Sequence, residues 1–444
     1  MLLNEHEKLS KVHYKIFALS WGGWVFDFYD LMLFTFLLIP IVSEFHLSNY
    51  MMSYVLGASL GATAIGGIVF GALSDIYGRK KVLQWTIILY SAGTVLCGLS
   101  TDIWSLLLFR IITGIGVGGE WATGQTLVNE TFPAKVRGRF GSFLETGTST
   151  GIILASIIGG FLAPEIGWRI CFFISAFPAL LIILIRKEMP ESDIWMERKL
   201  KNISSNLPSI QQVKGNFSAL FSKEFRRIFI YSILLALLVM SAYWFTFSWL
   251  PDYLYTERHL ELAKSAMWLI VTQVGAFLGC LSFGLVSDKL GRRPAFTIYS
   301  FLMATGLLMV TIMYNSLVSL PMAIFGFMFL LGFGTGIFGG FGPLYSELYP
   351  TKIRNTAMSA SFNLARGLQF FTPIVIAILG KNYGLSTGIV LGSVFAAMAG
   401  LWIWKFPETR GRKLQEIDED IYEKDIKKEE FNVNKIEHVE TDSE

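Results

Sequence analysis

The sequence predicts an all-α membrane protein with twelve transmembrane helices in two pseudo-symmetric six-helix halves. Three observations lead to this fold class: an apolar composition, twelve separate apolar segments, and short motifs that occur once in each half. Hydrophobic residues make up 53% of the 444 residues and charged residues only 16%, well below the roughly 25% of soluble domains. We therefore expect a lipid bilayer around the chain and no nucleic-acid partner.

Twelve apolar segments are each close to the length of about 20 residues that a helix needs to cross a bilayer. Lys and Arg concentrate in the connections after the second, fourth, sixth, eighth and tenth segments, whereas the connections after the first, third and ninth carry none. Positively charged residues favour the cytoplasmic side of a membrane. We therefore predict a plasma-membrane protein with both termini in the cytoplasm and with spans at residues 16–42, 52–73, 82–100, 103–129, 139–163, 168–187, 226–250, 262–286, 295–314, 317–345, 355–380 and 384–406.

The connection at residues 188–225 is the longest in the chain and divides it into two halves. We predict an N-terminal six-helix half at residues 1–187 and a C-terminal six-helix half at residues 226–411, with a cytoplasmic linker loop between them. Residues 412–444 are charged and lack a clear apolar periodicity, which predicts a mostly disordered cytoplasmic tail.

Short motifs recur in the same order in the two halves. A duplicated six-helix unit indicates a pseudo-symmetric bundle whose binding site lies between the halves, near the middle of the membrane. The recurring motifs are GALSDIYGRKK at Gly71–Lys81 with GLVSDKLGRRP at Gly284–Pro294, ETFPAKVR at Glu130–Arg137 with ELYPTKIR at Glu347–Arg354, and PES at Pro190–Ser192 with PET at Pro407–Thr409.

Two carboxyl groups, Asp27 and Asp30, lie near the middle of the first predicted span. A charged side chain at that depth costs about 2.5 to 3.5 kcal/mol, so its presence indicates a partner or a function. Residues three apart share one helix face, and two carboxyl groups this close disfavour double ionisation. One of them can therefore hold a proton near neutral pH. Proton or substrate binding is the preferred interpretation, and a structural pair with a buried Arg is the alternative.

The loop motif GxLxDxxGRR/K after the second span resembles the signature of the major facilitator superfamily of transporters. The stretch Arg110–Gly119 is similar to the proton-coupled symporter signature of the fourth helix, and Phe406–Gly411 resembles the PETKG ending of sugar porters and organic-acid symporters. The resemblance covers the chain except its tail. It implies the major facilitator fold and a transporter that works by alternating access, not an enzyme; we expect a monomer without a cofactor or a bound metal.

The two copies of the loop motif are the candidate gating elements. Their glycines permit tight turns. Their aspartates can accept hydrogen bonds from a neighbouring helix N-terminus or pair with basic residues on the same surface. Such contacts would exist only while the cytoplasmic gate is shut, and a clamp for folding and orientation is the alternative. The candidate residues are Asp75, Gly78, Arg79, Asp288, Gly291 and Arg292.

The fourth span combines a row of small residues with two charges. Gly114, Gly116, Gly118 and Gly119 predict close helix packing. By helix rise, Arg110 and Asp30 lie at similar depths, and in the family the first and fourth helices line the same half of the cavity. We favour a pair between Asp30 and Arg110, with Asp27 as the alternative acid. The candidate proton-coupling residues are Asp27, Asp30, Arg110, Glu120 and Glu145.

Arg366 falls near the centre of the eleventh predicted span without an obvious acidic partner at that depth in its own half. A guanidinium group binds a carboxylate through two parallel hydrogen bonds, so anion binding is the preferred interpretation. An ion pair across the cavity to Asp27, Glu120 or Glu145 is the alternative. The candidate substrate-binding residues are Arg366, Asn363, Tyr29, Gln273 and Trp244.

Two stretches differ from the pattern of sugar porters. Glu145 stands where a similar stretch of sugar porters carries a Gln, and the aromatic run Tyr243–Pro251 lacks their QQxxGxN pattern. Packing or lipid contact is the preferred interpretation of the aromatic run, and a stacking wall against substrate is the alternative. Conversely, Arg366, the stretch Asp27–Asp30 and the sequence Gly-Gly-Glu-Trp at Gly118–Trp121 resemble the sialate, lactate and aromatic acid:proton symporters.

These observations predict a secondary active transporter that carries a small organic anion together with protons. A sugar or polyol:proton symporter is the main alternative, because the loop motifs and the ending at Phe406–Gly411 are shared with that group. A drug:proton antiporter and a receptor built on a transporter scaffold are further alternatives.

Overall fold

The structure of the protein is a computed structural model that describes residues 3, 8–46, 49–187, 189–201, 209–247, 253, 258, 262–314, 321–369, 372, 375, 379 and 385–417. Each of the twelve predicted spans coincides with helix in these residues. The N-terminal half contains α1 (Lys11–Phe36), α2 (Leu38–Glu44), α3 (Asn49–Tyr77), α4 (Arg79–Gly98), α5 (Ile103–Gly118), α6 (Glu120–Thr131), α7 (Arg137–Leu144), α8 (Thr146–Ile157), α9 (Ala163–Ile166) and α10 (Trp168–Arg186).

The C-terminal half is also mostly helical in the residues that the structure describes. Of the predicted spans, the end of the seventh, the start of the tenth, most of the second part of the eleventh with Pro373, and the first residue of the twelfth lie outside the described residues. The described helices are α13 (Arg226–Phe247), α15 (Leu262–Leu290), α16 (Arg292–Thr311), α18 (Pro321–Gly334), α19 (Phe341–Ser346), α20 (Arg354–Leu368) and α22 (Leu385–Trp402).

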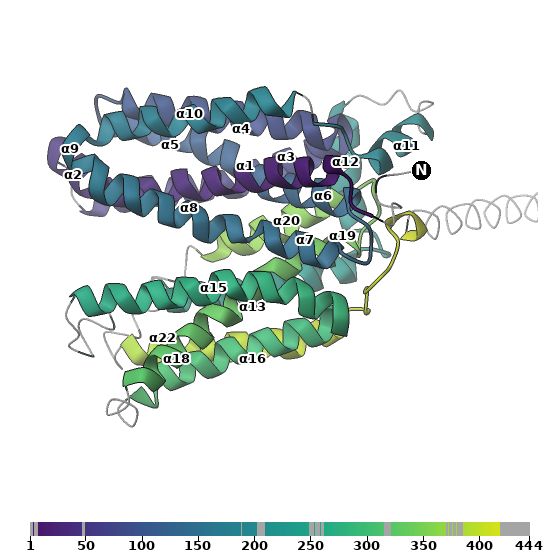
Figure 1. Cartoon of the computed structure of the whole chain (residues 1–444). Helices are drawn as coiled ribbons and strands as arrows, with labels where there is room; N and C mark the ends of the chain where they lie inside the picture. Colours follow the sequence, from purple (N-terminus) through teal and green to yellow (C-terminus); the bar gives the residue numbers. More distant parts are fainter. Residues whose placement is uncertain are drawn as a thin grey trace, which may run out of the picture.

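The helices form two bundles that lie side by side (Figure 1). Helices α1, α3, α4, α5, α8 and α10 form one bundle, and α13, α15, α16, α18 and α22 form the other. The bundles meet where α20 packs on α3 and where α7 packs on α15. Predicted spans four and ten are each interrupted: span four at the single residue Gly119 between α5 and α6, and span ten at a 3-10 segment, Thr335–Gly340, before α19.

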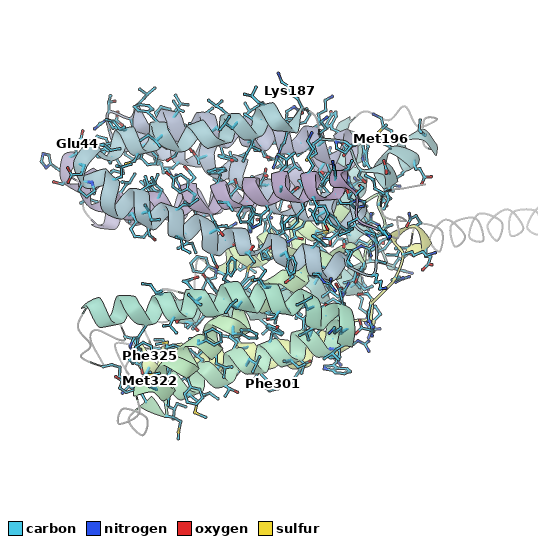
Figure 2. All side chains as sticks on the ribbon, in the orientation of Figure 1. Glu44, Lys187, Met196, Phe301, Met322 and Phe325 are labelled. Carbon is cyan, nitrogen blue, oxygen red and sulfur yellow. The ribbon has the colours of Figure 1, made fainter. Side chains whose placement is uncertain are left out.

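The outer surface of the bundles is apolar. The described residues contain 7 helices that are long and apolar enough to cross a membrane by length and composition. Met322 is 82% exposed and Phe301 is 42% exposed, and both lie at the periphery of the molecule (Figure 2). Exposed apolar surface on this scale is unfavourable in water and is covered by lipid in a bilayer.

The glycines of the fourth span allow close helix packing, as predicted. A Cβ atom on Gly118 would lie 2.0 Å from the Thr63 carbonyl oxygen of α3, and one on Gly114 would lie 2.6 Å from the Ser59 carbonyl oxygen. On the opposite side of α5, a Cβ atom on Gly116 would lie 2.5 Å from the Tyr90 backbone nitrogen of α4. Helix α5 is therefore held between α3 and α4 at a distance that side chains would prevent.

The linker at residues 188–225, predicted as a loop, includes two helices among its described residues. It contains α11 (Asp193–Lys201) and α12 (Ser209–Leu220). On α11, Ile194 is buried with Leu414 and Ile417 from the beginning of the tail, and the Trp195 indole donates a hydrogen bond to the Asp75 carbonyl oxygen. Isolated apolar residues of a polar linker thus contact residues that are distant in sequence. Residues 418–444 of the predicted tail lie outside the described residues.

Candidate functional site

The pair predicted between Asp30 and Arg110 is present. Arg110 Nη1 of α5 lies 3.2 Å from Asp30 Oδ2 of α1, and both side chains are buried. The Thr94 hydroxyl of α4 donates a hydrogen bond to Asp30 Oδ1 at 2.7 Å. The guanidinium group also lies over the Phe34 ring, 4.3 Å from its centroid. Asp30 is therefore held by a cation and a hydroxyl from two different helices.

A second buried ion pair joins Glu120 of α6 to Arg186 of α10, with Arg186 Nη2 2.6 Å from Glu120 Oε1. The Thr86 hydroxyl of α4 donates to Glu120 Oε2 at 2.9 Å. Gly23 leaves room for the pair, because a Cβ atom there would lie 2.2 Å from Glu120 Oε1. Glu120 is one of the predicted proton-coupling residues, whereas Arg186 was not predicted as a site residue. The available signal was an Arg at the end of a predicted span, where a boundary residue is the simpler interpretation.

Asp27 lies between these two ion pairs on α1. It follows Gly23 by one helical turn and precedes Asp30 by three residues, so all three share one face of the helix. Its side chain is 1% exposed, and neither carboxyl oxygen has a hydrogen-bond partner among the described residues. The charges that act on it are Glu120, Arg186, Asp30 and Arg366. A buried carboxyl without any donor is costly when ionised, so this group differs from its two neighbours.

Arg366 of α20 is part-exposed and forms no ion pair or hydrogen bond with a described residue. The charged group that acts on it is Asp27, in the opposite half. One turn earlier on α20, the Phe362 ring stacks on Trp121 of α6, with centroids 3.7 Å apart and planes 16° apart. The guanidinium group thus lies one turn beyond an aromatic contact that joins the two halves.

Glu145 lies at the junction of α7 and α8 and is 5% exposed. Its Oε1 atom accepts hydrogen bonds from Trp121 Nε1 at 2.6 Å and from Gln125 Nε2 at 2.9 Å. It forms no ion pair with a described residue. Glu145 is therefore tied to the same tryptophan that stacks on Phe362, and not to a cation.

The other candidate substrate-binding residues do not all converge on Arg366. The Asn363 amide donates to the Ser359 carbonyl oxygen of its own helix at 3.0 Å. The Tyr29 hydroxyl is hydrogen-bonded to Ser175 of α10 at 2.8 Å, within the N-terminal half. Gln273 and Trp244 are part-exposed, and Trp244 meets Tyr243 edge-on with centroids 5.6 Å apart. Residues 248–251 of the aromatic run lie outside the described residues.

The gating candidates meet at one end of the bundle, where Arg79, Arg137, Arg292 and Arg354 lie; we call it the basic end. Asp75 accepts hydrogen bonds from the Asn355 and Thr356 backbone N–H groups, at 3.2 and 2.8 Å, and so caps the N-terminus of α20 in the other half. In the second copy, Asp288 accepts from the Arg139 backbone N–H at 2.8 Å. The expected contacts between aspartates and helix N-termini are present in both copies.

Two glutamates bridge the halves at the basic end. Glu130 accepts from Arg79 of its own half at 2.9 Å and from Arg354 of the other half at 2.6 Å. Glu347 accepts from Arg292 of its own half at 2.7 Å and lies 3.4 Å from Arg137 Nη1 of the other half. The described contacts hold the basic end closed.

The recurring PES and PET motifs cap helices next to the loop glycines. Glu191 accepts from the Arg79 and Lys80 backbone N–H groups at the start of α4. Glu408 does the same for Arg292 and Arg293 at the start of α16. Gly78 and Gly291, with φ of 100° and 109°, precede these helices, and a Cβ atom on either would crowd the capping carboxylate. Burial raises the pKa of the Glu191 carboxyl, against the lowering effect of these hydrogen bonds.

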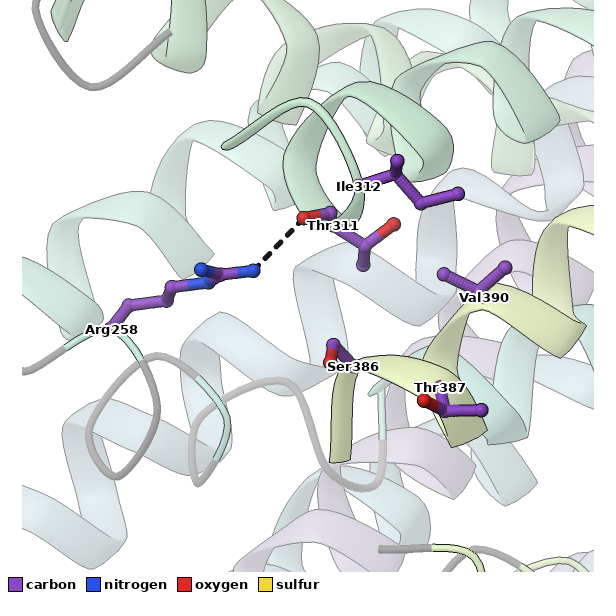
Figure 3. Close-up of a pocket in the computed structure, with 6 residues that line it drawn as sticks. All are labelled: Arg258, Thr311, Ile312, Ser386, Thr387 and Val390. Carbon is purple, nitrogen blue, oxygen red and sulfur yellow. Dashed lines mark hydrogen bonds between the residues drawn. The ribbon is translucent and has the colours of Figure 1, made fainter. Parts of the chain in front are cut away.

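A separate pocket lies at the far end of the C-terminal half, between the end of α16 and the start of α22 (Figure 3). Arg258 Nη2 donates to the Thr311 carbonyl oxygen there at 2.9 Å. None of the predicted site residues lines this pocket. Its lining consists of Arg258, Thr311, Ile312, Ser386, Thr387 and Val390.

Two helical bundles with buried ion pairs and a closed basic end define a membrane transporter. Residues 19–369 match the Major Facilitator Superfamily, and the chain belongs to this family. It is 31% identical over 383 residues to the sialic acid transporter NanX of Escherichia coli, covering 85% of this chain and 90% of that protein. It is 29% identical over 399 residues to the cis,cis-muconate transport protein of Acinetobacter baylyi, covering 88% of this chain and 94% of that protein.

Solved structures share the fold. The proton:xylose symporter XylE bound to 6-bromo-6-deoxy-D-glucose superposes with a TM-score of 0.76 at 20% identity, covering 91% of this chain and 98% of that one. The predicted fold class is therefore confirmed, and the chain is a transporter and not an enzyme. The names of these relatives and structural neighbours refer to small organic anions or to sugars as substrates.

Proposed function

We propose that the protein couples the symport of a small organic carboxylate to protons by alternating access. The observation that carries this proposal is Arg366, a part-exposed guanidinium group without a hydrogen-bond or ion-pair partner among the described residues. A carboxylate satisfies such a group with two parallel charge-assisted hydrogen bonds. The unpaired Asp27 carboxyl acts on it from the opposite half.

The balance of buried charges supports coupling at Asp27. In the N-terminal half, Asp30 is paired with Arg110 and Glu120 with Arg186, so Asp27 is left over. In the empty carrier, Arg366 balances ionised Asp27 across the interface. When a substrate carboxylate binds Arg366, ionised Asp27 loses its counter-charge, and a proton neutralises it. Substrate and proton therefore favour one another's binding. The sequence alone favoured Asp30 as the acid. Because Asp30 is already held by Arg110 and Thr94, Asp27 is the better proposal.

The named relatives favour an acid over a sugar. Sialic acid, cis,cis-muconate and niacin, which appear in the names of the relatives, are all carboxylic acids. The solved sugar symporters share 20% identity with this chain, which indicates the fold and no substrate. A sugar or polyol:proton symporter therefore stays the alternative.

The proposed function is tested with the purified full-length protein in proteoliposomes under an imposed proton gradient. The labelled compounds are N-acetylneuraminate, cis,cis-muconate, nicotinate, nicotinamide and xylose. We expect the gradient to drive accumulation of at least one of the acids. Nicotinamide and xylose should not accumulate, because they lack a carboxylate for Arg366. Proton-driven accumulation of xylose without that of any acid would replace the carboxylate proposal by the sugar alternative.

We further propose that the basic end faces the cytoplasm of a plasma-membrane protein and acts as its gate, in line with the Lys and Arg distribution. A cysteine at Ser205, in a variant without Cys97, Cys171 and Cys280, should react with an impermeant reagent only from the inside. Thr126 contacts Asn355 across the halves, so a cysteine at this position should be protected from the reagent while the basic end is closed. In Asp75→Asn the same cysteine should react with the reagent from the inside. Labelling of either site from outside intact cells would contradict the orientation.

A further inference from the structure

Helix α4 presents three hydroxyl groups in a row toward the buried carboxyl groups. Thr86, Tyr90 and Thr94 are four residues apart and so occupy one face of the helix. At the two ends of this row the hydroxyls are occupied: Thr86 donates to Glu120 at 2.9 Å and Thr94 donates to Asp30 at 2.7 Å. Tyr90 lies between them, as Asp27 lies between Gly23 and Asp30 on α1.

The middle of the row is unpaired on both sides. The Tyr90 side chain is 2% exposed and its hydroxyl has no hydrogen-bond partner among the described residues. The same holds for both oxygens of Asp27. Asp27 is the charged group that acts most strongly on the Tyr90 hydroxyl, ahead of Glu120, Arg186 and Asp30. A phenol hydroxyl donates one hydrogen bond, and the two flanking carboxylates already accept from the threonines.

The other groups that face Asp27 are committed elsewhere. Glu120 and Asp30 are acceptors when ionised and cannot stabilise a second carboxylate. Arg186 binds Glu120 and also donates to the Leu83 carbonyl oxygen at 3.0 Å, and Arg110 binds Asp30. Each arginine keeps one buried Nε–H without an acceptor among the described residues. Of the two, Arg186 acts on Asp27 and is the competing donor. Arg366 faces Asp27 from the other half of the protein.

We propose that Tyr90 is the positioning residue of the proton site: its hydroxyl donates a hydrogen bond to Asp27 when the carboxyl is ionised and releases it when the carboxyl is protonated. The proton binds a carboxyl oxygen of Asp27, and Tyr90 keeps its own proton throughout. Tyr90 thereby stabilises the charged form during the part of the cycle in which Arg366 is occupied or distant. The proposal rests on the proposed function only in taking Asp27 as the coupling acid.

The test is a pH titration of the carboxyl bands of the purified full-length protein by infrared spectroscopy, which needs no transported substrate. Asp27→Asn identifies the band of Asp27 by its loss. We expect Tyr90→Phe to move the titration midpoint of this band upward by about one to two pH units, because a hydrogen bond to the charged form is lost. Tyr90→Phe keeps the ring and removes a hydroxyl that has no partner in this conformation, so we expect it to fold.

Tyr299→Phe is the matched control. Tyr299 is a buried tyrosine of the C-terminal half, and its hydroxyl donates at 2.7 Å to Ser282 of the same half. This substitution should leave the midpoint unchanged. An unchanged midpoint in Tyr90→Phe together with a shift in Arg186→Lys would overturn the proposal in favour of the Arg186 Nε–H. An Asp27→Asn protein that lost no titrating band would overturn it as well.

Transport by the same variants separates this inference from the proposed function. In proteoliposomes that accumulate N-acetylneuraminate or nicotinate, Tyr90→Phe should move the pH dependence of proton-driven uptake in the direction of the infrared shift and leave exchange of labelled acid within about twofold. If the wild type accumulates no acid but the Asp27 band still shifts in Tyr90→Phe, the carboxylate proposal fails and the role of Tyr90 stands.

Discussion

Arg366→Lys should weaken the binding of a transported carboxylic acid by about 1.5 to 3 kcal/mol, the range of hydrogen bonds that involve a charged group. The substitution keeps the positive charge and removes the planar fork that binds both oxygens of a carboxylate. The uncharged amide of the same acid should bind poorly to both proteins, because it carries no negative charge and has only one oxygen that can accept from the guanidinium group. Isothermal titration of nicotinate and nicotinamide, or of whichever acid the wild type accumulates with its amide, measures the difference.

Arg258→Lys is the matched control for this experiment. Arg258 lies in the same half but at its far end, where it contacts the Thr311 carbonyl oxygen and lines the separate pocket. Its replacement should leave the affinity for the acid unchanged. Equal binding of acid and amide to the wild type would remove the carboxylate proposal. Unchanged affinity in Arg366→Lys would assign the anion to another group.

Asp27→Asn should abolish proton-driven accumulation of substrate while exchange of labelled substrate across the membrane continues. The amide imitates a carboxyl that is permanently protonated, so the loaded carrier can still change conformation but the proton gradient no longer drives it. Because neither Asp27 oxygen has a hydrogen-bond partner among the described residues, the substitution breaks no bond in this conformation. Uptake under a proton gradient and counterflow without one, in the same proteoliposomes, measure the two activities.

Asp30→Asn is the comparison that separates coupling from structure. It leaves the buried Arg110 guanidinium without its counter-charge, and breaking a buried ion pair from one side costs about 3 to 5 kcal/mol. We therefore expect a lower thermal stability in detergent than for Asp27→Asn and a parallel loss of exchange and accumulation. If Asp27→Asn accumulates substrate normally and Asp30→Asn retains exchange alone, Asp30 is the proton site, as the sequence suggested.

The basic end was the most predictable part of the site. The spacing of Asp75 and Arg79 in a repeated loop motif places an acceptor and a donor on one surface, and the structure brings Asp75 to the start of α20. The pairing of Asp30 with Arg110 was predictable from depth, because helix rise fixes how far along the membrane each residue lies. The repeat of Glu191 and Glu408 was visible in the sequence, but their role as caps of α4 and α16 was not.

By itself, the sequence determined the fold, the two halves, the membrane segments and the set of charges that must lie within them, because hydropathy and helix rise act along the chain. Only the tertiary structure decided which charges pair. Arg186 reaches Glu120 and Thr94 reaches Asp30, whereas the Tyr90 hydroxyl and the Asp27 carboxyl have no hydrogen-bond partner in the described part of the chain. Depth along a helix follows from residue number, but the rotation of each helix about its axis is set by packing, as where Gly114 and Gly118 let α5 approach α3. That rotation decides which side chains meet, and it cannot be predicted from the sequence of any one segment.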